Sequence, residues 1–175
     1  AAKNRYGATN EIGVFEMDDT GLREVPNPSQ MLLEGRLTDE PGTCVTCVME
    51  GARPVLAEVQ ALLTPSAFGN PRRSTNGFDY NRAMLLMAVL EKRGGLSVNT
   101  CDAYLNVIGG LYLDEPGADL AAVLALASSF RDKPVPADLV AVGEVGLTGE
   151  LRSVSALNQR LSEIHRLGFK KCLVP

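Results

Sequence analysis

Residues 111–130, LYLDEPGADLAAVLALASSF, join a short apolar segment to a run rich in Ala and Leu. Pro116 and Gly117 interrupt regular structure at the join, so the segment predicts a strand, a tight turn and a helix. Many enzymes place a nucleophile at such a turn, because the N-terminus of a helix offers unpaired N–H groups and a positive dipole end. This turn, from Glu115 to Asp119, contains no hydroxyl or thiol group. The sequence therefore predicts the platform without the nucleophile.

Other apolar segments predict strands. They are TCVTCVMEG (43–51), RPVLAEVQALLT (53–64), AYLNVIGGLYL (103–113), LVAVGEVGLTGELRSV (139–154) and KCLV (171–174). The first two predict a pair joined at residues 51–52, the third a strand or a hairpin, and the fourth another strand pair. Residues 71–77 are polar and rich in turn-forming types, which predicts a loop.

Segments with helical periodicity separate these strands. One begins near Tyr80, with Asp79 as its N-cap, and ends at the two glycines 94–95. The Ala/Leu-rich run from Gly117 is the second. A third follows Ser155 as N-cap, and its apolar residues share one face: Leu157, Leu161 and Ile164. The resulting order, β-β-α-β-α-β-β-α-β, predicts an α+β fold in which helices pack on a mixed β-sheet.

The first 28 residues form a separate unit in this interpretation. EIGVFEMDDTGLREV (11–25) has apolar alternation on both sides of residues 18–21, which predicts a β-hairpin, and residues 26–29 (PNPS) predict a rigid polar linker. A pair of strands is only marginally stable alone. We therefore divide the chain into residues 1–28 and 29–175, and expect it to be a piece of a longer protein with a sheet domain before the hairpin.

Composition limits the functions to consider. The formal net charge is −4, which argues against nonspecific nucleic-acid binding by the chain as a whole. No apolar run is long enough to span a bilayer, so we expect no membrane partner. Cys44 and Cys47 form a CxxC pattern without a second pair, and residues three apart in a strand point to opposite faces. We expect buried structural thiols, no metal site and a reducing cytoplasm.

Two segments resemble the proteolytic domain of Lon proteases. DEPGADLA resembles the segment that carries the family's serine, and VGEVGLTGELRSVSALNQRLSEIHRLGFKKCLVP resembles the Gly-Glu strand, the catalytic-lysine helix and the strand that follows. The likeness covers about residues 99–175. It places the serine position on Gly117 and the lysine position on Arg160. Glycine has no hydroxyl group, and arginine, with a pKa above about 12, does not accept a proton, so the resemblance implies a degenerate dyad without proteolysis.

The first residues resemble a second family. KNRYG (3–7), followed by ATNEIGVFEMDDTGLREV (8–25), resembles the end of the RecA-like ATPase core in the RadA family of bacterial DNA-repair and recombination proteins. In that family a Lon-like domain follows the hairpin. The resemblance implies a homo-oligomeric, hexameric ring that acts as an ATP-driven motor on single-stranded and branched DNA, promotes branch migration and cooperates with the RecA recombinase.

The same resemblance implies cofactors that belong to other parts of such a protein. ATP and Mg would bind a Walker A loop, and zinc would bind an N-terminal four-cysteine module. The present sequence has no GxxxxGK[ST] motif and no second CxxC pair, so we expect no cofactor in this chain and no ATP hydrolysis by it alone. Lys3, Asn4 and Arg5 would respond to nucleotide in a neighbouring subunit, with Lys3 and Arg5 reaching its γ-phosphate.

Basic residues in the predicted loop 71–77, and on or beside the helix that follows it, suggest a DNA contact. The candidates are Arg72, Arg73, Arg82, Lys92 and Arg93. On one interpretation they form a strip for DNA phosphates, and on the other they are solvated surface charges. His165 is expected to be structural or exposed. Glu144 is the best remaining acidic candidate near the degenerate dyad, and a strand-end carboxylate also serves as an ion-pair or capping partner.

These observations lead to one expected function and two alternatives. We expect a non-proteolytic Lon-like domain that supports ring assembly and DNA binding in a protein for DNA repair and homologous recombination. The first alternative is a Lon-type peptidase with displaced catalytic residues, for which the hydroxyls available are Ser97, Ser128, Ser129 and Ser155. The second is a module for protein interaction without DNA contact.

Overall fold

A computed structural model of the chain describes residues 15–25, 27–67 and 69–175. Its main sheet has six strands in the spatial order β10–β7–β3–β4–β6–β5. Their bounds are Thr43–Glu50 (β3), Arg53–Pro65 (β4), Arg73–Asn76 (β5), Cys101–Val107 (β6), Leu139–Ala141 (β7) and Lys171–Leu173 (β10). The pairs β3–β4 and β4–β6 are antiparallel, whereas β5, β7 and β10 join in parallel. The sheet is mixed, as predicted.

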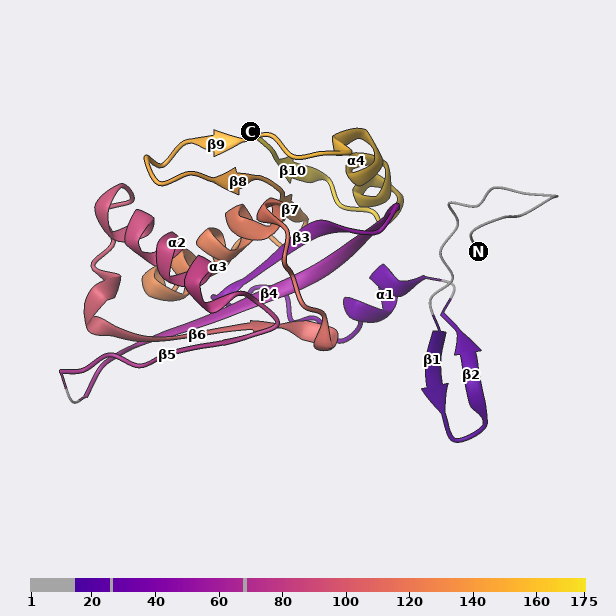
Figure 1. The fold of residues 1–175 in the computed structure, drawn as a ribbon, viewed down its shortest axis with the longest axis horizontal. Coiled ribbons are helices and arrows are strands. Elements are labelled where there is room, and N and C mark those ends of the chain that lie inside the picture. The colour runs from indigo at the N-terminus through magenta and orange to yellow at the C-terminus, as the bar shows by residue number, and fades with distance from the viewer. Residues whose placement is uncertain (1–14, 26, 68) are drawn as a thin grey trace.

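Helices cover this sheet on both faces (Figure 1). Helices α2 (Tyr80–Lys92) and α3 (Asp119–Arg131) bury their apolar side chains against one face, in the larger of two apolar clusters. On the other face lie α1 (Pro28–Leu32) and α4 (Leu157–Arg166), with Ile164 of α4 in the smaller cluster. The predicted α+β class, with helices packed on a mixed sheet, is therefore confirmed.

Strand β3 shows how the sequence specifies the two clusters. Cys44 and Val48 lie in the larger cluster, and Val45 and Cys47 lie in the smaller one. Successive side chains of a strand point to opposite faces, so a strand covered on both sides is apolar at nearly every position. The prediction that the two cysteines of the CxxC pattern are buried and face opposite ways is confirmed.

Helix boundaries agree with the sequence at α2 and differ at α4. The Asp79 side chain caps α2 by accepting a hydrogen bond from the Arg82 backbone N–H at 2.7 Å. The predicted cap of α4, Ser155, is wrong. The N-cap is Ala156, with φ of +54°, and it makes no side-chain capping bond. The Ser155 carbonyl instead accepts from Nε of Arg160 at 2.9 Å, so a buried arginine stabilises this helix start.

Two further predictions need correction. The expected loop at residues 71–77 contains strand β5, which pairs in parallel with β6. The pairing gives these polar residues backbone partners, and Asn76 also donates to Asn106 at 2.7 Å. The strand expected just before the 115–119 turn is reduced to a single bridge between Leu113 and Phe78. In both segments, pairing with a distant part of the chain determined the secondary structure, and the local residue types did not.

The N-terminal hairpin consists of β1 (Phe15–Asp18) and β2 (Gly21–Glu24), as predicted. The linker after it is more ordered than expected, because Pro28 opens α1 and Ser29 is buried. The Ser29 hydroxyl donates to Oε1 of Glu163 and accepts from the Leu56 N–H, both at 3.0 Å. Through Ser29, the linker is thus hydrogen-bonded to β4 and α4.

The remaining elements are short. Strands β8 (Glu144–Val145) and β9 (Leu151–Arg152) form their own antiparallel sheet. Single 3₁₀ turns lie at Val98–Thr100 (η1), Ile108–Gly110 (η2) and Pro116–Ala118 (η3). In the part of the chain that the structure describes, no helix has the length and apolar character needed to cross a membrane.

Candidate functional site

The turn that precedes α3 lies inside the molecule. Turn η3 leads directly into α3 at Asp119, and both Gly117 and Ala118 are buried. The Gly117 carbonyl accepts from the Gly143 N–H at 2.9 Å, and the Gly143 carbonyl accepts from the Leu120 N–H at 3.1 Å. These backbone bonds hold the turn against the segment that leads into β8. The expected turn and helix start are present, but their N–H groups are not free, since those of Ala118, Asp119 and Leu120 donate to backbone carbonyls.

Arg160 reaches this turn from α4, with its side chain completely buried. It donates from Nη1 and Nη2 to the two carboxylate oxygens of Glu115, at 2.5 and 2.8 Å. The same guanidinium donates to the backbone carbonyls of Cys47 and Ser155. Oε1 of Glu115 also accepts from the Met49 N–H at 3.2 Å. A buried cation is tolerated because a bidentate carboxylate and carbonyl acceptors replace water.

The two positions matched to the Lon dyad are neighbours in space. A Cβ atom built on Gly117 would lie 3.3 Å from Nη1 of Arg160 and 3.1 Å from Oε1 of Glu115. It would also lie 3.4 Å from Cγ1 of Val154. The arginine therefore fills the space that faces the nucleophile position, and little room remains for a larger side chain at Gly117.

This arrangement lacks both parts of a serine–lysine mechanism. Gly117 has no atom that can attack a carbonyl carbon, and a guanidinium does not act as a general base because it remains protonated. The buried Arg160 guanidinium therefore has a structural role: it joins the helix α4, the strand β3 and the turn η3.

Sequence reasoning missed Glu115 and pointed to Glu144 instead. Glu144 lies half-buried on β8, whereas Glu115 is the carboxylate that contacts Arg160. A signal for Glu115 was present in the sequence. An arginine at a buried position requires a counterion. The resemblance predicts that Arg160 faces Gly117, and Glu115 stands only two residues before that glycine.

A second ion pair, buried on its Asp119 side, joins the first residue of α3 to Arg82 of α2. Asp119 is 1% exposed and accepts from Nε of Arg82 at 2.9 Å and from the Val145 N–H at 3.0 Å. Nη2 of Arg82 contacts the same carboxylate and donates to the Val145 carbonyl at 3.0 Å. The hydrogen bond that Arg82 donates to Asp119 raises the pKa of Arg82 above its usual value. Arg82 thus joins α2 to α3 and β8, and its predicted contact with DNA stays a prediction.

A cavity of about 230 Å³ lies beside both ion pairs. Its lining includes four carboxylates and one guanidinium, from Asp79, Arg82, Asp114, Glu115 and Asp119. Negative charge therefore dominates its wall, and it is unsuited to a DNA phosphate.

The other predicted DNA-binding residues occupy different environments. Arg73 begins β5, and its guanidinium donates to the carbonyls of Cys101, Val98 and Asn99. Arg72 is exposed, and so are Lys92 and Arg93 at the end of α2. Arg73 is thus hydrogen-bonded to backbone carbonyls elsewhere in the chain. Three of the five predicted DNA-binding side chains are exposed.

Lys3, Asn4 and Arg5 lie outside the described residues. Their predicted response to a nucleotide in a neighbouring subunit stays a prediction.

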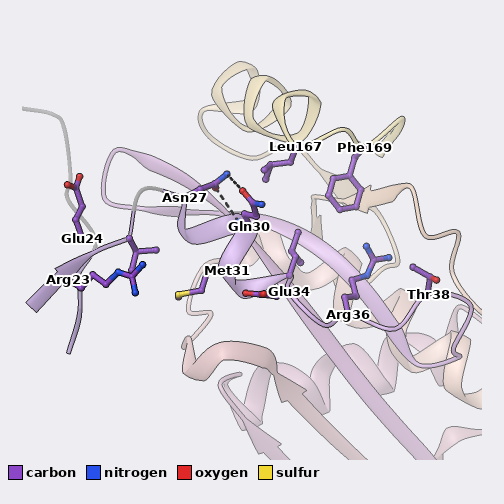
Figure 2. Close-up of a pocket in the computed structure, with 12 residues that line it drawn as sticks. Arg23, Glu24, Asn27, Gln30, Met31, Glu34, Arg36, Thr38, Leu167 and Phe169 are labelled. Atoms are coloured by element: carbon purple, nitrogen blue, oxygen red, sulfur yellow. Dashed lines mark hydrogen bonds between the residues drawn. The ribbon is translucent and has the colours of Figure 1, made fainter. Parts of the chain in front are cut away.

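A cavity of about 730 Å³ lies where the hairpin meets the rest of the described chain (Figure 2). Arg23 and Glu24 of β2 stand at one end, and Phe169, after α4, stands at the other. The Arg36 guanidinium lies 5.7 Å from the centre of the Phe169 ring and contacts Glu58 at 3.7 Å. Apolar side chains and charges of both signs share this wall, so the groove has no electrostatic preference for an anion or a cation.

Cysteine and histidine form no metal centre here. Among the described residues, no group of three or more His, Cys, Asp or Glu side chains is placed to hold a metal ion. Burial raises the pKa of both Cys44 and Cys47 to about 12, so these thiols are protonated near neutral pH. His165 is exposed on α4.

Comparison with known proteins agrees with this geometry. Residues 101–175 match the family of the Lon protease (S16) C-terminal proteolytic domain, so this part of the chain has the Lon-type fold. Over all its residues, the chain is 57% identical to the DNA repair protein RadA of Bacillus subtilis and 57% identical to that of Streptococcus pneumoniae. It is 53% identical to the same protein of Halalkalibacterium halodurans. The chain belongs to the RadA family and spans 38 to 42% of the length of these relatives.

Proposed function

We propose that this chain is a non-proteolytic, structural Lon-like domain of a DNA repair protein. The observation that carries the proposal is the buried Arg160–Glu115 ion pair beside Gly117. Gly117 and Arg160 stand at the matched dyad positions, and they supply neither a nucleophile nor a base. The relatives named DNA repair protein RadA supply the context of repair.

Two of the four hydroxyls considered for the alternative peptidase, those of Ser128 and Ser129, have structural hydrogen-bond partners. The Ser128 hydroxyl donates to the Lys133 carbonyl at 2.6 Å and accepts from the Gly42 N–H at 2.9 Å. The Ser129 hydroxyl accepts from the Leu63 N–H at 2.9 Å. Both serines lie near the C-terminal end of α3, about 17 Å along the helix from the η3 turn. These two hydroxyls stabilise the ends of segments in the fold.

In the finer form of the proposal, the whole protein acts in homologous recombination as an ATP-dependent branch-migration motor. ATP with Mg, and zinc, would bind parts of the protein outside this chain. The present domain would support a hexameric ring and offer Arg72, Lys92 and Arg93 to single-stranded or branched DNA, while the whole protein works with RecA. The exposure of these three side chains supports the DNA contact.

Survival of DNA damage tests the proposal. In the complete protein, Arg160→Met with Glu115→Leu removes both charges of the buried ion pair and keeps apolar volume there. Cells with this variant should survive a DNA cross-linking agent as well as cells with the parent protein, at equal protein abundance, whereas deletion of the gene should sensitise them. Sensitivity equal to deletion, at undiminished abundance, would show that the site performs chemistry. If deletion of the gene does not sensitise the cells to the cross-linking agent, the proposed role in DNA repair is contradicted.

DNA binding is tested separately, by the affinity of the complete protein at several salt concentrations. An absence of measurable DNA binding, even at low salt, would favour the module for protein interaction alone.

A further inference from the structure

Strand β5 forms one edge of the main sheet, and β6 is its neighbour on the inner side (Figure 1). The Arg72 carbonyl, just before β5, accepts from the Ala103 N–H of β6 at 2.9 Å and therefore faces β6. Successive residues of a parallel strand direct their backbone groups to opposite sides, so Arg73 and Thr75 turn theirs outward. No strand that the structure describes pairs with this outer side. The N–H and C=O groups of both residues are thus available to another strand.

A groove runs beside this edge, between β5, helix α2 and turn η1. Its volume is about 280 Å³. Met84, Met87 and Ala88 of α2 and Val98 of η1 supply its apolar wall, and Arg73 lines it from β5. Ala88 is exposed, so the groove is open to solvent. Methionine adapts its shape to irregular apolar partners, and this wall therefore suits apolar side chains of different shapes. We call this space the edge groove.

The outer edge and the edge groove are arranged to receive one strand. Thr75 pairs in register with Leu105, which belongs to the apolar cluster on the α2 side of the sheet. A strand added at β5 would continue the sheet, and every second side chain of that strand would point to the same side. Those side chains would meet the edge groove, while the backbone bonds to Arg73 and Thr75. Strand addition with pockets for alternate side chains is a common mode of peptide recognition.

Basic side chains mark one end of the edge groove. Arg73 shares the groove with Ala88 and Glu91, so the beginning of β5 lies beside the end of α2. Arg72 is exposed just before β5, and Lys92 is exposed one helical turn after Ala88. The Glu91 carboxylate already accepts a backbone hydrogen bond at 3.0 Å. Acidic groups of a bound peptide would be attracted to this end.

The charge also indicates a direction for the peptide. Antiparallel strand pairs are more frequent than parallel pairs and slightly more stable per residue. In a peptide antiparallel to β5, the C-terminal end lies beside the beginning of β5. Arg72 and Lys92 stand at that end.

We propose that the outer edge of β5 binds an extended peptide segment of a partner protein. The segment lies antiparallel to β5, has apolar side chains at alternate positions for the edge groove, and carries Asp or Glu toward its C-terminal end. This protein-binding site is additional to the proposed function and does not depend on it. Because Arg72 and Lys92 are also offered to DNA in that function, peptide binding is measured without DNA.

A selection from random octapeptides displayed on phage identifies such a segment. The library is first depleted on the Ala88→Glu chain and then selected on the parent chain. Ala88 is exposed in the groove wall, so this substitution adds a carboxylate to the edge groove without removing a core side chain. The enriched peptides should have apolar residues at alternate positions, followed by Asp or Glu. No enrichment, or enriched peptides without this alternation, would overturn the proposal.

Variants of β5 test the backbone contact with an enriched peptide, synthesised with fluorescein and measured by fluorescence anisotropy. Thr75→Pro removes an N–H that faces outward, and edge strands tolerate proline in that orientation. It should weaken binding about fivefold or more, as the loss of one backbone hydrogen bond implies. Ser74→Gln is the matched control, because the Ser74 side chain is exposed on the opposite face of the same strand, and its affinity should be unchanged. Equal affinities of the Thr75→Pro and parent chains would exclude strand addition.

N-methylation of the same peptide tests the strand pairing without altering the chain, so its result does not depend on how well a variant folds. Alternate residues of an added strand direct their N–H groups toward β5 and away from it. A single N-methyl group, moved along the peptide one residue at a time, should weaken binding about fivefold or more at every second position only. A loss of affinity without this alternation would contradict the proposed pairing.

Discussion

Replacing Arg160 with methionine should destabilise the chain strongly. The change leaves the Glu115 carboxylate without its bidentate partner and frees the carbonyl of Cys47. Breaking a buried ion pair by removing one partner costs about 3 to 5 kcal/mol. The Glu115 side chain is 23% exposed, so water can solvate part of the uncovered charge, and the lower end of that range applies. About 3 kcal/mol corresponds to a fall in Tm of about 6 to 12 °C for a chain of this size.

Removing both charges should cost less than removing one. In Arg160→Met with Glu115→Leu no carboxylate is left without a partner, although the Met49 N–H and the carbonyls of Cys47 and Ser155 lose theirs. Ser155 is exposed, so water can replace the partner of its carbonyl. Each such lost hydrogen bond contributes about 1 kcal/mol, so we expect a loss of about 1 to 2 kcal/mol, smaller than that of the single variant.

An exposed ion pair in the same chain provides the control. Arg152 contacts Glu150 at 2.8 Å with its side chain 64% exposed, so Arg152→Met should change the free energy of unfolding by no more than about 0.5 kcal/mol. Thermal and urea unfolding of all variants at pH 7 measure these differences. If Arg160→Met and Arg152→Met lower the stability equally, the buried pair does not have the structural role assigned to it.

Further predictions follow from other residues. Cys44 and Cys47, whose pKa is raised to about 12 by burial, should resist alkylation at pH 8 until the chain unfolds, as measured by mass spectrometry; rapid labelling of the native chain would contradict this. The pKa of Glu163 is lowered from 4.5, chiefly by its hydrogen bond from Arg166, so its contribution to stability is complete above that pH and disappears as the pH falls through the lowered value. The Tm difference between parent and Glu163→Gln should therefore shrink below pH 4.5, and a difference that grows there would refute the reasoning. In the complete protein, Arg72→Glu should lower the slope of log K against log salt for duplex DNA by about 0.9 per lost phosphate contact, and an unchanged slope and affinity would place the DNA path elsewhere.

The sequence predicted the parts of this fold that depend on local chemistry. Asp79 caps α2 because its carboxylate is a short acceptor at the right position, and the alternation in β3 directs Cys44 and Cys47 to opposite faces. Resemblance to the Lon family indicated Gly117 and Arg160, and the structure places them side by side.

The missed features depend on contacts between distant segments. Ser29 was interpreted as part of a polar linker, yet its partners are Leu56 and Glu163, and neither is near it in sequence. Arg82 was interpreted as a surface charge because its partner Asp119 is 37 residues away. Such pairings are decided by packing, which periodicity and residue type do not specify.

The most direct test of a structural, non-proteolytic site is a peptidase assay on the purified chain. Casein and short peptides should not be cleaved, and a fluorophosphonate probe should label no serine, because Gly117 has no hydroxyl and Arg160 is held by Glu115. The Arg160→Met variant serves as the matched sample, since it removes the cation from the site. Sustained cleavage by the parent chain that disappears in Arg160→Met would contradict the account, whereas the absence of cleavage in both chains is the result it predicts.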